Sequence, residues 1–209
     1  MRILNDPPVE KAVVYPAPWD EQVRGATQFY RATIGFVFDN TEAWDPIRQM
    51  MSKLGPLPAT AVIDTRVHML MPDMYPCIPG WHVDGAPRVD NVPQLHKASP
   101  YLTHFIMNVG DCAPTHMVSG GRVFDVEGDE AYKELDQKVN DWLDGDRGYI
   151  KAESGVIYKL TGRTIHRGSP ATKRGWRWFG RISIGDEAKP ENEIRTQTQV
   201  YLSTLNKGW

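Results

Sequence analysis

Two stretches near the start of the chain carry apolar residues at helical spacing. In the first, residues 20–34, apolar groups recur every three or four positions. The second has sharper ends, because Asp45 can cap it, Pro46 suits the first helical position and Gly55 can stop it. Its apolar stripe consists of Ile47, Met50, Met51 and Leu54. The pattern therefore predicts one helix in each stretch.

The period changes to two between Ile63 and Met71, where apolar and polar residues alternate as in a half-buried strand. The polar residues Asp64, Arg66 and His68 share one face of this strand. We expect this face to be solvated, and the alternative is that it lines a substrate pocket. Further strand-like segments are Trp81–Asp84, Tyr101–Val109, Gly121–Val126, Gly155–Leu160, Thr164–Arg167, Trp176–Ile184 and Thr196–Leu202. The middle and end of the chain are therefore predicted to be mainly β.

One further helix is predicted within the β region, over residues 129–143, with Tyr132, Leu135, Val139 and Trp142 on one face. Many short strands with a few helices indicate a sandwich or barrel of antiparallel strands with helices packed outside. We expect a single domain over residues 1–209. Residues 1–60 would form a helical N-terminal support, and residues 62–205 the β core with the helix as an insertion.

Composition and charge narrow the class of protein. Hydrophobic residues make up 41% of the chain and charged residues 24%, as in soluble globular proteins. The formal net charge of −2 gives no general attraction to nucleic acid or to anionic membranes. No apolar run approaches the roughly 18 residues of a membrane span, and the N-terminus lacks a secretory signal pattern. With only Cys77 and Cys112 as cysteines, we expect a cytoplasmic protein.

The main chemical signal is the pair His82 and Asp84. Side chains two positions apart on a strand share a face, so these two could bind one metal ion. A third ligand must come from one of the other histidines, and His166 is the best candidate because a strand, turn and strand surround it. The remaining histidines are His68, His96, His104 and His116. Two imidazoles and one carboxylate form the ligand set of non-haem Fe(II), which leaves coordination positions open.

Two arginines on one strand form the second signal. In the alternating segment Trp176–Ile184, Arg177 and Arg181 share a face opposite the tryptophans. Buried guanidinium groups require anionic partners, and each can hold a carboxylate through two hydrogen bonds. A dicarboxylate ligand would satisfy both, with Arg174 as a rival for either role.

Together, His82-Val83-Asp84, His166 and Arg177 resemble the His-x-Asp…His…Arg signature of Fe(II)/2-oxoglutarate-dependent dioxygenases. The resemblance covers roughly residues 62–185. It implies a double-stranded β-helix, or jelly roll, with His82, Asp84 and His166 holding Fe(II). It also implies that Arg177 binds the distant carboxylate of 2-oxoglutarate, and that Arg181 approaches the other carboxylate.

By the same resemblance, Tyr101 and Thr103 stand where the family often supplies a hydroxyl group to the cosubstrate. The implied reaction consumes O2 and 2-oxoglutarate, releases succinate and CO2, and hydroxylates a substrate or demethylates it through hydroxylation. Halogenation is disfavoured because Asp84 occupies the position that chloride needs. The expected substrate is a small molecule or an amino-acid-type group, although the sequence selects neither the substrate nor the oligomeric state.

Two alternatives stay open at this stage. The same chemistry could act on a nucleic acid, with the basic stretch Arg163–Arg181 as a phosphate-binding face. The protein could instead be a metal-binding, cupin-like protein without oxygenase activity.

Overall fold

The computed structural model describes residues 1–14, 19–127, 130–145, 147–185 and 189–202. The fold is mainly β with flanking helices, which confirms the predicted class. Its centre is a five-stranded antiparallel sheet with the order β2-β12-β8-β14-β4. These strands are β2 (Val9–Val13), β12 (Val156–Thr161), β8 (Thr103–Val109), β14 (Gly175–Ile184) and β4 (Val62–Leu70). We call this the major sheet.

A smaller sheet with the order β11-β9-β13 lies against the major sheet, and we call it the minor sheet. Its strands are β11 (Tyr149–Lys151), β9 (Thr115–Val118) and β13 (His166–Gly168). The other strands pair two by two: β1 (Arg2–Asn5) with β10 (Arg122–Asp125), β3 (Phe29–Tyr30) with β15 (Glu193–Ile194), β5 (Met74–Tyr75) with β16 (Tyr201–Leu202), and β6 (Arg88–Val89) with β7 (Val92–Pro93).

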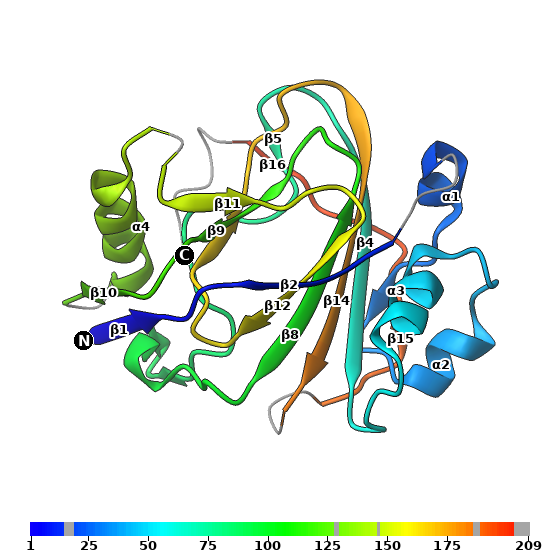
Figure 1. The fold of residues 1–209 in the computed structure, drawn as a ribbon, viewed down its shortest axis with the longest axis horizontal. Helices are drawn as coiled ribbons and strands as arrows, with labels where there is room; N and C mark the ends of the chain where they lie inside the picture. Colours follow the sequence, from blue (N-terminus) through cyan, green and yellow to red (C-terminus); the bar gives the residue numbers. More distant parts are fainter. Residues whose placement is uncertain (15–18, 128–129, 146, 186–188, 203–209) are drawn as a thin grey trace.

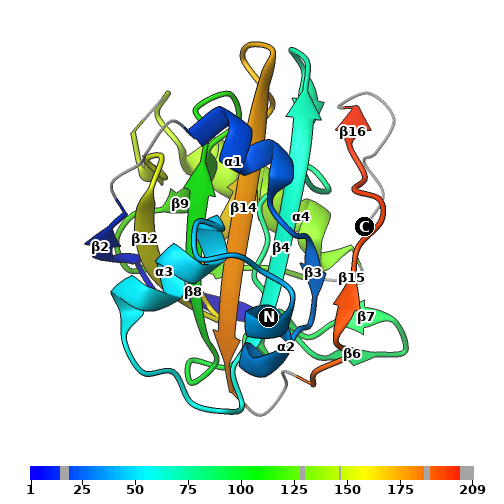
Figure 2. The same ribbon diagram turned by 90° about the vertical axis from the view of Figure 1, so that its right-hand side faces the viewer.

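Helices flank the two sheets on opposite sides (Figure 1). Helices α1 (Trp19–Gly25), α2 (Ile34–Asp39) and α3 (Pro46–Leu54) cover the outer face of the major sheet, as the turned view in Figure 2 shows. Helix α4 (Ala131–Trp142) lies beyond the minor sheet at the other end of the molecule. A short 3-10 helix, η1 (Leu95–Lys97), precedes β8. The order of layers is therefore helices, major sheet, minor sheet and α4.

Helix α3 follows the sequence prediction closely. The Asp45 side chain accepts a hydrogen bond from the Ile47 backbone N–H at 3.0 Å, and Gly55 ends the helix with a φ of 76°. Its buried residues are Pro46, Ile47, Met50 and Met51. Helix α4 is also confirmed, with Ala131, Tyr132, Leu135 and Val139 buried.

The helix predicted over residues 20–34 is wrong in its second half. Helix α1 ends at Gly25, and Phe29 and Tyr30 instead form β3. The Phe29 backbone N–H donates to Thr65 Oγ1 at 2.8 Å, and Ala32 forms a backbone bridge to β4. Pairing with the sheet therefore overrides the helical periodicity of this segment.

The first 60 residues also hold β1 and β2, so this region is not only helical. Strand β2 forms one edge of the major sheet, and β1 pairs with β10. Residues 15–18 of the expected N-terminal support, residue 129 of the expected helix and residues 203–205 of the expected core lie outside the described residues.

Alternation along β14 divides the interior into an apolar and a polar layer. Trp178 and Ile182 are buried against α1–α3, together with other apolar residues of the outer layer. A second apolar layer, which includes Trp81 and Leu135, lies between the minor sheet and α4. Complete burial of one such side chain stabilises the fold by roughly 1.5–3 kcal/mol. The opposite face of β14, which carries Arg177 and Arg181, therefore faces the space between the two sheets.

The polar face of β4 is not solvated, contrary to the prediction. Asp64 is only 6% exposed and His68 only 2%. Both belong to the inner face of β4, because its apolar positions pack outward against the helices. The space between the sheets therefore contains charged groups from two neighbouring strands.

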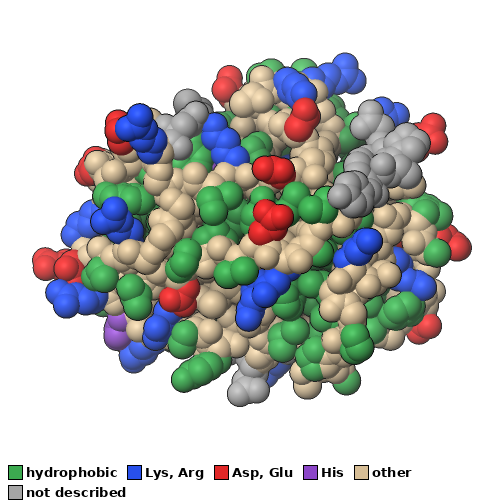
Figure 3. Space-filling model, in the orientation of Figure 1, with side chains coloured by type: hydrophobic (Ala, Val, Ile, Leu, Met, Phe, Trp, Pro, Cys, Tyr) green, Lys and Arg blue, Asp and Glu red, His purple; other side chains and the backbone are tan. Residues whose placement is uncertain are grey.

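No helix in the part of the chain that the structure describes is long and apolar enough to cross a membrane. On the face shown in Figure 3, basic and acidic side chains are interspersed and neither sign gathers into one large patch.

Candidate metal centre

A backbone bridge brings His82 and His166 together although 84 residues separate them in the sequence. Each residue donates its backbone N–H to the carbonyl of the other at 2.9 Å. The segment that carries His82 thus extends the minor sheet beyond β13. The two imidazole rings consequently lie side by side, with centroids 4.5 Å apart.

Backbone carbonyls fix the orientation of both imidazoles. His82 Nδ1 lies 3.0 Å from the Gly80 carbonyl, and His166 Nδ1 lies 2.9 Å from the Thr164 carbonyl. A carbonyl only accepts hydrogen bonds, so each Nδ1 carries the proton and Nε2 is the nitrogen able to bind a metal ion. Such partners are usual around histidine ligands of metals.

Asp84 completes the group. One ligand atom each from His82, Asp84 and His166 can be chosen so that all three lie within 4.8 Å of one another. Burial mainly lowers the pKa of His82 to about 4, so this imidazole is neutral near pH 7, as a metal ligand must be. The structure thus has a site at which two imidazoles and one carboxylate could hold a metal ion.

The positive charge of Arg181 is the main reason that Asp84 stays ionised. Burial alone would raise the pKa of Asp84, but Arg181, His166 and His104 hold it well below its usual range. Arg181 Nη1 donates to Asp84 Oδ2 at 2.7 Å, and His166 Nε2 lies 3.6 Å from the same oxygen. The carboxylate is therefore both negative and fixed in orientation.

The three residues open into a cavity of about 160 Å3 between the sheets. Its wall includes Ile106 and Phe179 of the major sheet and Cys77 of the loop before His82. Burial raises the pKa of the Cys77 thiol, so this group is uncharged near pH 7. The cavity has room for a small organic molecule beside the metal ligands.

Arg177 also lines this cavity and is only 4% exposed. Its Nε donates to the Ala113 carbonyl at 2.7 Å, and its Nη2 donates to Asn108 Oδ1 at 2.7 Å and to Thr115 Oγ1 at 3.2 Å. Burial lowers the pKa of Arg177 to about 10, which still leaves it charged near pH 7. Within the described ranges no carboxylate forms an ion pair with it.

Arg181, which was expected to approach a ligand carboxylate, already contacts carboxylates of the protein. Besides Asp84 it contacts Asp64, with Nη2 3.1 Å from Asp64 Oδ2. Burial alone would lower the pKa of Arg181, but the two aspartates raise it above its ordinary value. Its partners are therefore carboxylates of the protein itself, and one of them belongs to the metal site.

The other residues predicted for the cosubstrate lie away from the cavity. Tyr101 is 88% exposed, and Arg174 is exposed as well. Thr103 shares the face of β8 that carries Phe105, which packs outward toward the helices. The structure therefore brings His82, Asp84, His166 and the two arginines of β14 together, but not Tyr101, Thr103 or Arg174.

Helix α4 contributes contacts to the metal site that sequence reasoning missed. The Trp81 backbone N–H donates to Asp136 Oδ1 at 2.8 Å, and Trp81 Nε1 donates to Asn140 Oδ1 at 3.1 Å. The Tyr132 hydroxyl donates to the Val83 carbonyl at 3.0 Å. The helical spacing of Tyr132, Asp136 and Asn140 was visible in the sequence, but nothing there indicated which strand this face meets.

Three of the remaining histidines also lie inside the protein. His104 is buried and its Nδ1 lies 2.8 Å from Ser183 Oγ, while His68 Nε2 lies 3.2 Å from the Gln199 carbonyl. His116 is buried against the ring of Tyr149, and His96 is exposed.

Comparisons with known proteins do not assign a family. No family model matches this sequence, and no curated protein matches it. One similar solved structure is AviO1 from Streptomyces viridochromogenes Tue57, with 15% identity, a TM-score of 0.45 and coverage of 90% of this chain and 93% of that one. Another is EvdMO1, with 13% identity, a TM-score of 0.45 and coverage of 88% of this chain and 48% of that one. The interpretation of the site therefore depends on its own geometry.

Proposed function

We propose that this protein is an Fe(II)- and 2-oxoglutarate-dependent oxygenase built on a double-stranded β-helix. One observation carries the proposal: a single cavity contains both Arg177 and the group of His82, Asp84 and His166. Arg177 is a buried cation that lacks an anionic partner among the described residues. Two antiparallel sheets that enclose this cavity support the jelly-roll assignment.

The residues fit the proposed metal. His82 and His166 present imidazole Nε2 atoms, Asp84 supplies one negative charge, and this donor set suits Fe(II) while leaving positions for other ligands. When bound, iron would supply the activation of O2 that is coupled to oxidative decarboxylation of 2-oxoglutarate. Arg181 would hold the Asp84 carboxylate in place through the contact at 2.7 Å.

Arg177 fits the distant carboxylate of 2-oxoglutarate. A buried cation without a counter-charge destabilises a protein by several kcal/mol, so a ligand anion is the simplest partner for it. Ala113, Asn108 and Thr115 fix the guanidinium by its Nε and Nη2 groups, which leaves the rest of its fork to hold a carboxylate. Arg177 thereby selects a dicarboxylate cosubstrate and sets its distance from the metal ligands.

The expected substrate is a small molecule or an amino-acid-type group, which would be hydroxylated, or demethylated through hydroxylation. A nucleic-acid substrate has less support, because the basic stretch of residues 163–181 does not form a continuous outer surface. Arg177 is buried, Arg181 is paired with two aspartates, and Arg167 lies over the Trp81 ring at 4.4 Å.

Spectroscopy under anaerobic conditions tests the proposal. Protein mixed with Fe(II) and 2-oxoglutarate should develop the visible charge-transfer band of the chelated cosubstrate, and added O2 should yield succinate slowly even without a substrate. His82→Ala, Asp84→Ala and His166→Ala should each abolish the band, whereas His96→Ala, at an exposed position, should retain it.

A band that never forms, or that survives the loss of His166, would rule the proposal out. A metal that binds the three residues without any response to 2-oxoglutarate would favour the alternative of a cupin-like metal-binding protein.

A further inference from the structure

A second cavity, of about 300 Å3, adjoins the metal centre. It shares Asp64, Arg66, Asp84 and Arg181 with the first cavity and extends from them toward β3 and the start of β8. A ligand in the second cavity would therefore lie next to the metal ligand Asp84. Arg177 lines the first cavity and not the second, so the two cavities do not offer a ligand the same set of cations.

Four arginines line the second cavity, and three of them have carboxylate partners. Arg31 Nη1 lies 2.7 Å from Glu191 Oε1. Arg181 contacts Asp84 and Asp64, and Arg195 Nη2 lies 3.2 Å from Asp64 Oδ1. These three arginines balance three carboxylates, so their formal charges cancel.

Arg66 is the fourth arginine and has no carboxylate partner among the described residues. It lies on the inner face of β4 and lines both cavities, and within the described part of the chain its side chain makes no hydrogen bond or ion pair. Burial, followed by the charges of Arg195 and Arg181, lowers the pKa of Arg66. The second cavity therefore carries one uncompensated positive charge, at the side that borders the metal centre.

The rest of the wall combines apolar and neutral polar groups. Val62, Leu102 and the ring of Tyr30 give it apolar surface, while Ser183 and His104 offer hydrogen-bonding atoms. Burial mainly lowers the pKa of His104 to about 4, so this side chain adds no charge near pH 7. An organic molecule with one anionic group matches such a wall better than a neutral or cationic one.

We propose that the second cavity is the site of the oxidised substrate, and that this substrate is a small organic anion whose carboxylate or phosphate group binds Arg66. This inference rests on the proposed function only in calling the ligand a substrate. Anion binding by Arg66 requires neither the metal nor the cosubstrate. The anionic group would anchor the molecule, while its apolar part lies along the Tyr30 and Leu102 wall beside Asp84.

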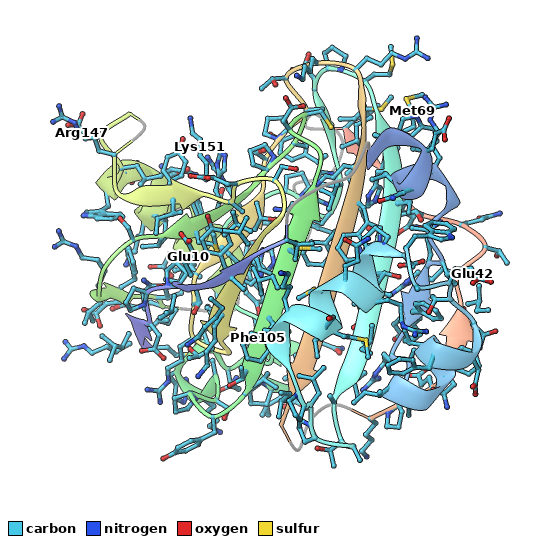
Figure 4. All side chains as sticks on the ribbon, turned by 45° about the vertical axis from the view of Figure 1, so that its right-hand side comes forward. Glu10, Glu42, Met69, Phe105, Arg147 and Lys151 are labelled. Carbon is cyan, nitrogen blue, oxygen red and sulfur yellow. The ribbon has the colours of Figure 1, made fainter. Side chains whose placement is uncertain are left out.

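Binding measurements on the metal-free protein test the site itself. Benzoate and benzamide have nearly the same shape and differ in charge, so ligand-observed NMR titrations with both isolate the anionic contribution. The wild type should bind benzoate at least ten times more tightly than benzamide. Arg66→Met should reduce benzoate binding to the level of benzamide. Arg147→Met should leave it unchanged, since Arg147 lies at the far end of the molecule (Figure 4).

Equal affinities for benzoate and benzamide, or a loss confined to Arg177→Met, would overturn the proposal. The same holds if Arg66→Met raises the 2-oxoglutarate concentration needed for the charge-transfer band as much as Arg177→Met does, because Arg66 would then serve the cosubstrate. If the band never forms but benzoate binding still depends on Arg66, the proposed function fails and the anion site stands.

Thermal stability separates a ligand-binding role of Arg66 from a structural one. Removal of a partly buried charge without a partner should leave the melting temperature of the ligand-free protein unchanged or raise it. Benzoate should then stabilise the wild type but not Arg66→Met. A variant that melts well below the wild type would show instead that the fold needs Arg66, and would overturn the assignment.

Discussion

At the scale of single residues, the buried arginines of this protein differ in whether a carboxylate of the protein balances their charge. Arg181 is held by two aspartates, whereas Arg177 and Arg66 have no carboxylate partner among the described residues. Two buried histidines, His68 and His104, are kept neutral beside them. The cavities beside the candidate metal site therefore contain positive charge that no described carboxylate balances, and the two neutral histidines make the stability of the fold depend on pH.

The free energy of unfolding of the metal-free protein should fall as the pH decreases from about 6.5. Burial, with Arg177 next, lowers the pKa of His68 to about 3, and burial lowers that of His104 to about 4. The unfolded chain takes up protons near pH 6.5 and the folded chain does not, so acid favours unfolding. Each histidine should reduce stability by up to ~1.4 kcal/mol per pH unit in this range.

Urea unfolding at pH 7 and pH 5 measures this effect. His68→Gln and His104→Gln should each weaken the pH dependence by up to about 2 kcal/mol over this interval. His96→Gln, at an exposed position, serves as the control and should leave the dependence unchanged. A pH dependence that stays the same in both buried variants would contradict the assignment.

At the scale of elements, helix α4 supports the strand segment that carries His82 and Asp84. Its contacts reach Trp81 and Val83, the residues on either side of His82, so the helix holds the backbone from which the first metal ligand projects. The same segment is held from its other side by the backbone bridge to His166. The metal site is therefore positioned by two elements that are distant in sequence.

Asp136→Leu should weaken metal binding although Asp136 is not a metal ligand. The change leaves the buried N–H of Trp81 without an acceptor, which costs about 1–3 kcal/mol, and loosens the segment around His82. Losses of 10–100-fold in metal affinity are typical for partners that orient metal ligands. Competition with a chelator measures the affinity. Asp141→Leu, at an exposed position of the same helix, is the matched control, and an equal loss in both variants would exclude a specific role for Asp136.

Local sequence patterns predicted some of these elements and not others. Helix α3 was predictable because Asp45 and Gly55 mark its ends, and β14 because its alternation is regular. The break after Gly25 was not predictable, because β3 forms only by pairing with β15 and bridging to β4.

For the candidate site, the sequence predicted the local spacing of ligands but not the contacts between strands. The i, i+2 spacing of His82 and Asp84 is local information. The pairing of Arg181 with Asp64 and Asp84, and the burial of Arg66, depend instead on which strands become neighbours.

At the scale of the whole molecule, the proposed metal and cosubstrate should stabilise the folded protein by mass action. Ligand at one hundred times its dissociation constant adds about 2.7 kcal/mol. For a chain of 209 residues, each kcal/mol corresponds to roughly 2–4 °C in melting temperature. With Fe(II) present under anaerobic conditions, saturating 2-oxoglutarate should therefore raise the melting temperature by roughly 5–11 °C.

Scanning calorimetry with matched ligands distinguishes this prediction from nonspecific stabilisation. 2-Oxobutyrate retains the keto and adjacent carboxylate groups but lacks the distant carboxylate, so it should stabilise the wild type much less. Arg177→Met should respond equally to the two ligands. A full response of this variant to 2-oxoglutarate would show that Arg177 does not bind the distant carboxylate.

The bridge between His82 and His166 also bears on when the site can form during synthesis. It closes a loop of 84 residues, for which the loss of chain entropy is about 4 kcal/mol. Two backbone hydrogen bonds, at about 0.5–1.5 kcal/mol each, do not offset that loss. The bridge must depend on the minor sheet and on α4, and the minor sheet needs the chain up to at least residue 168. A nascent chain that ends before this point has only one half of the candidate metal site, so we predict that a metal ion binds only after synthesis of the β core.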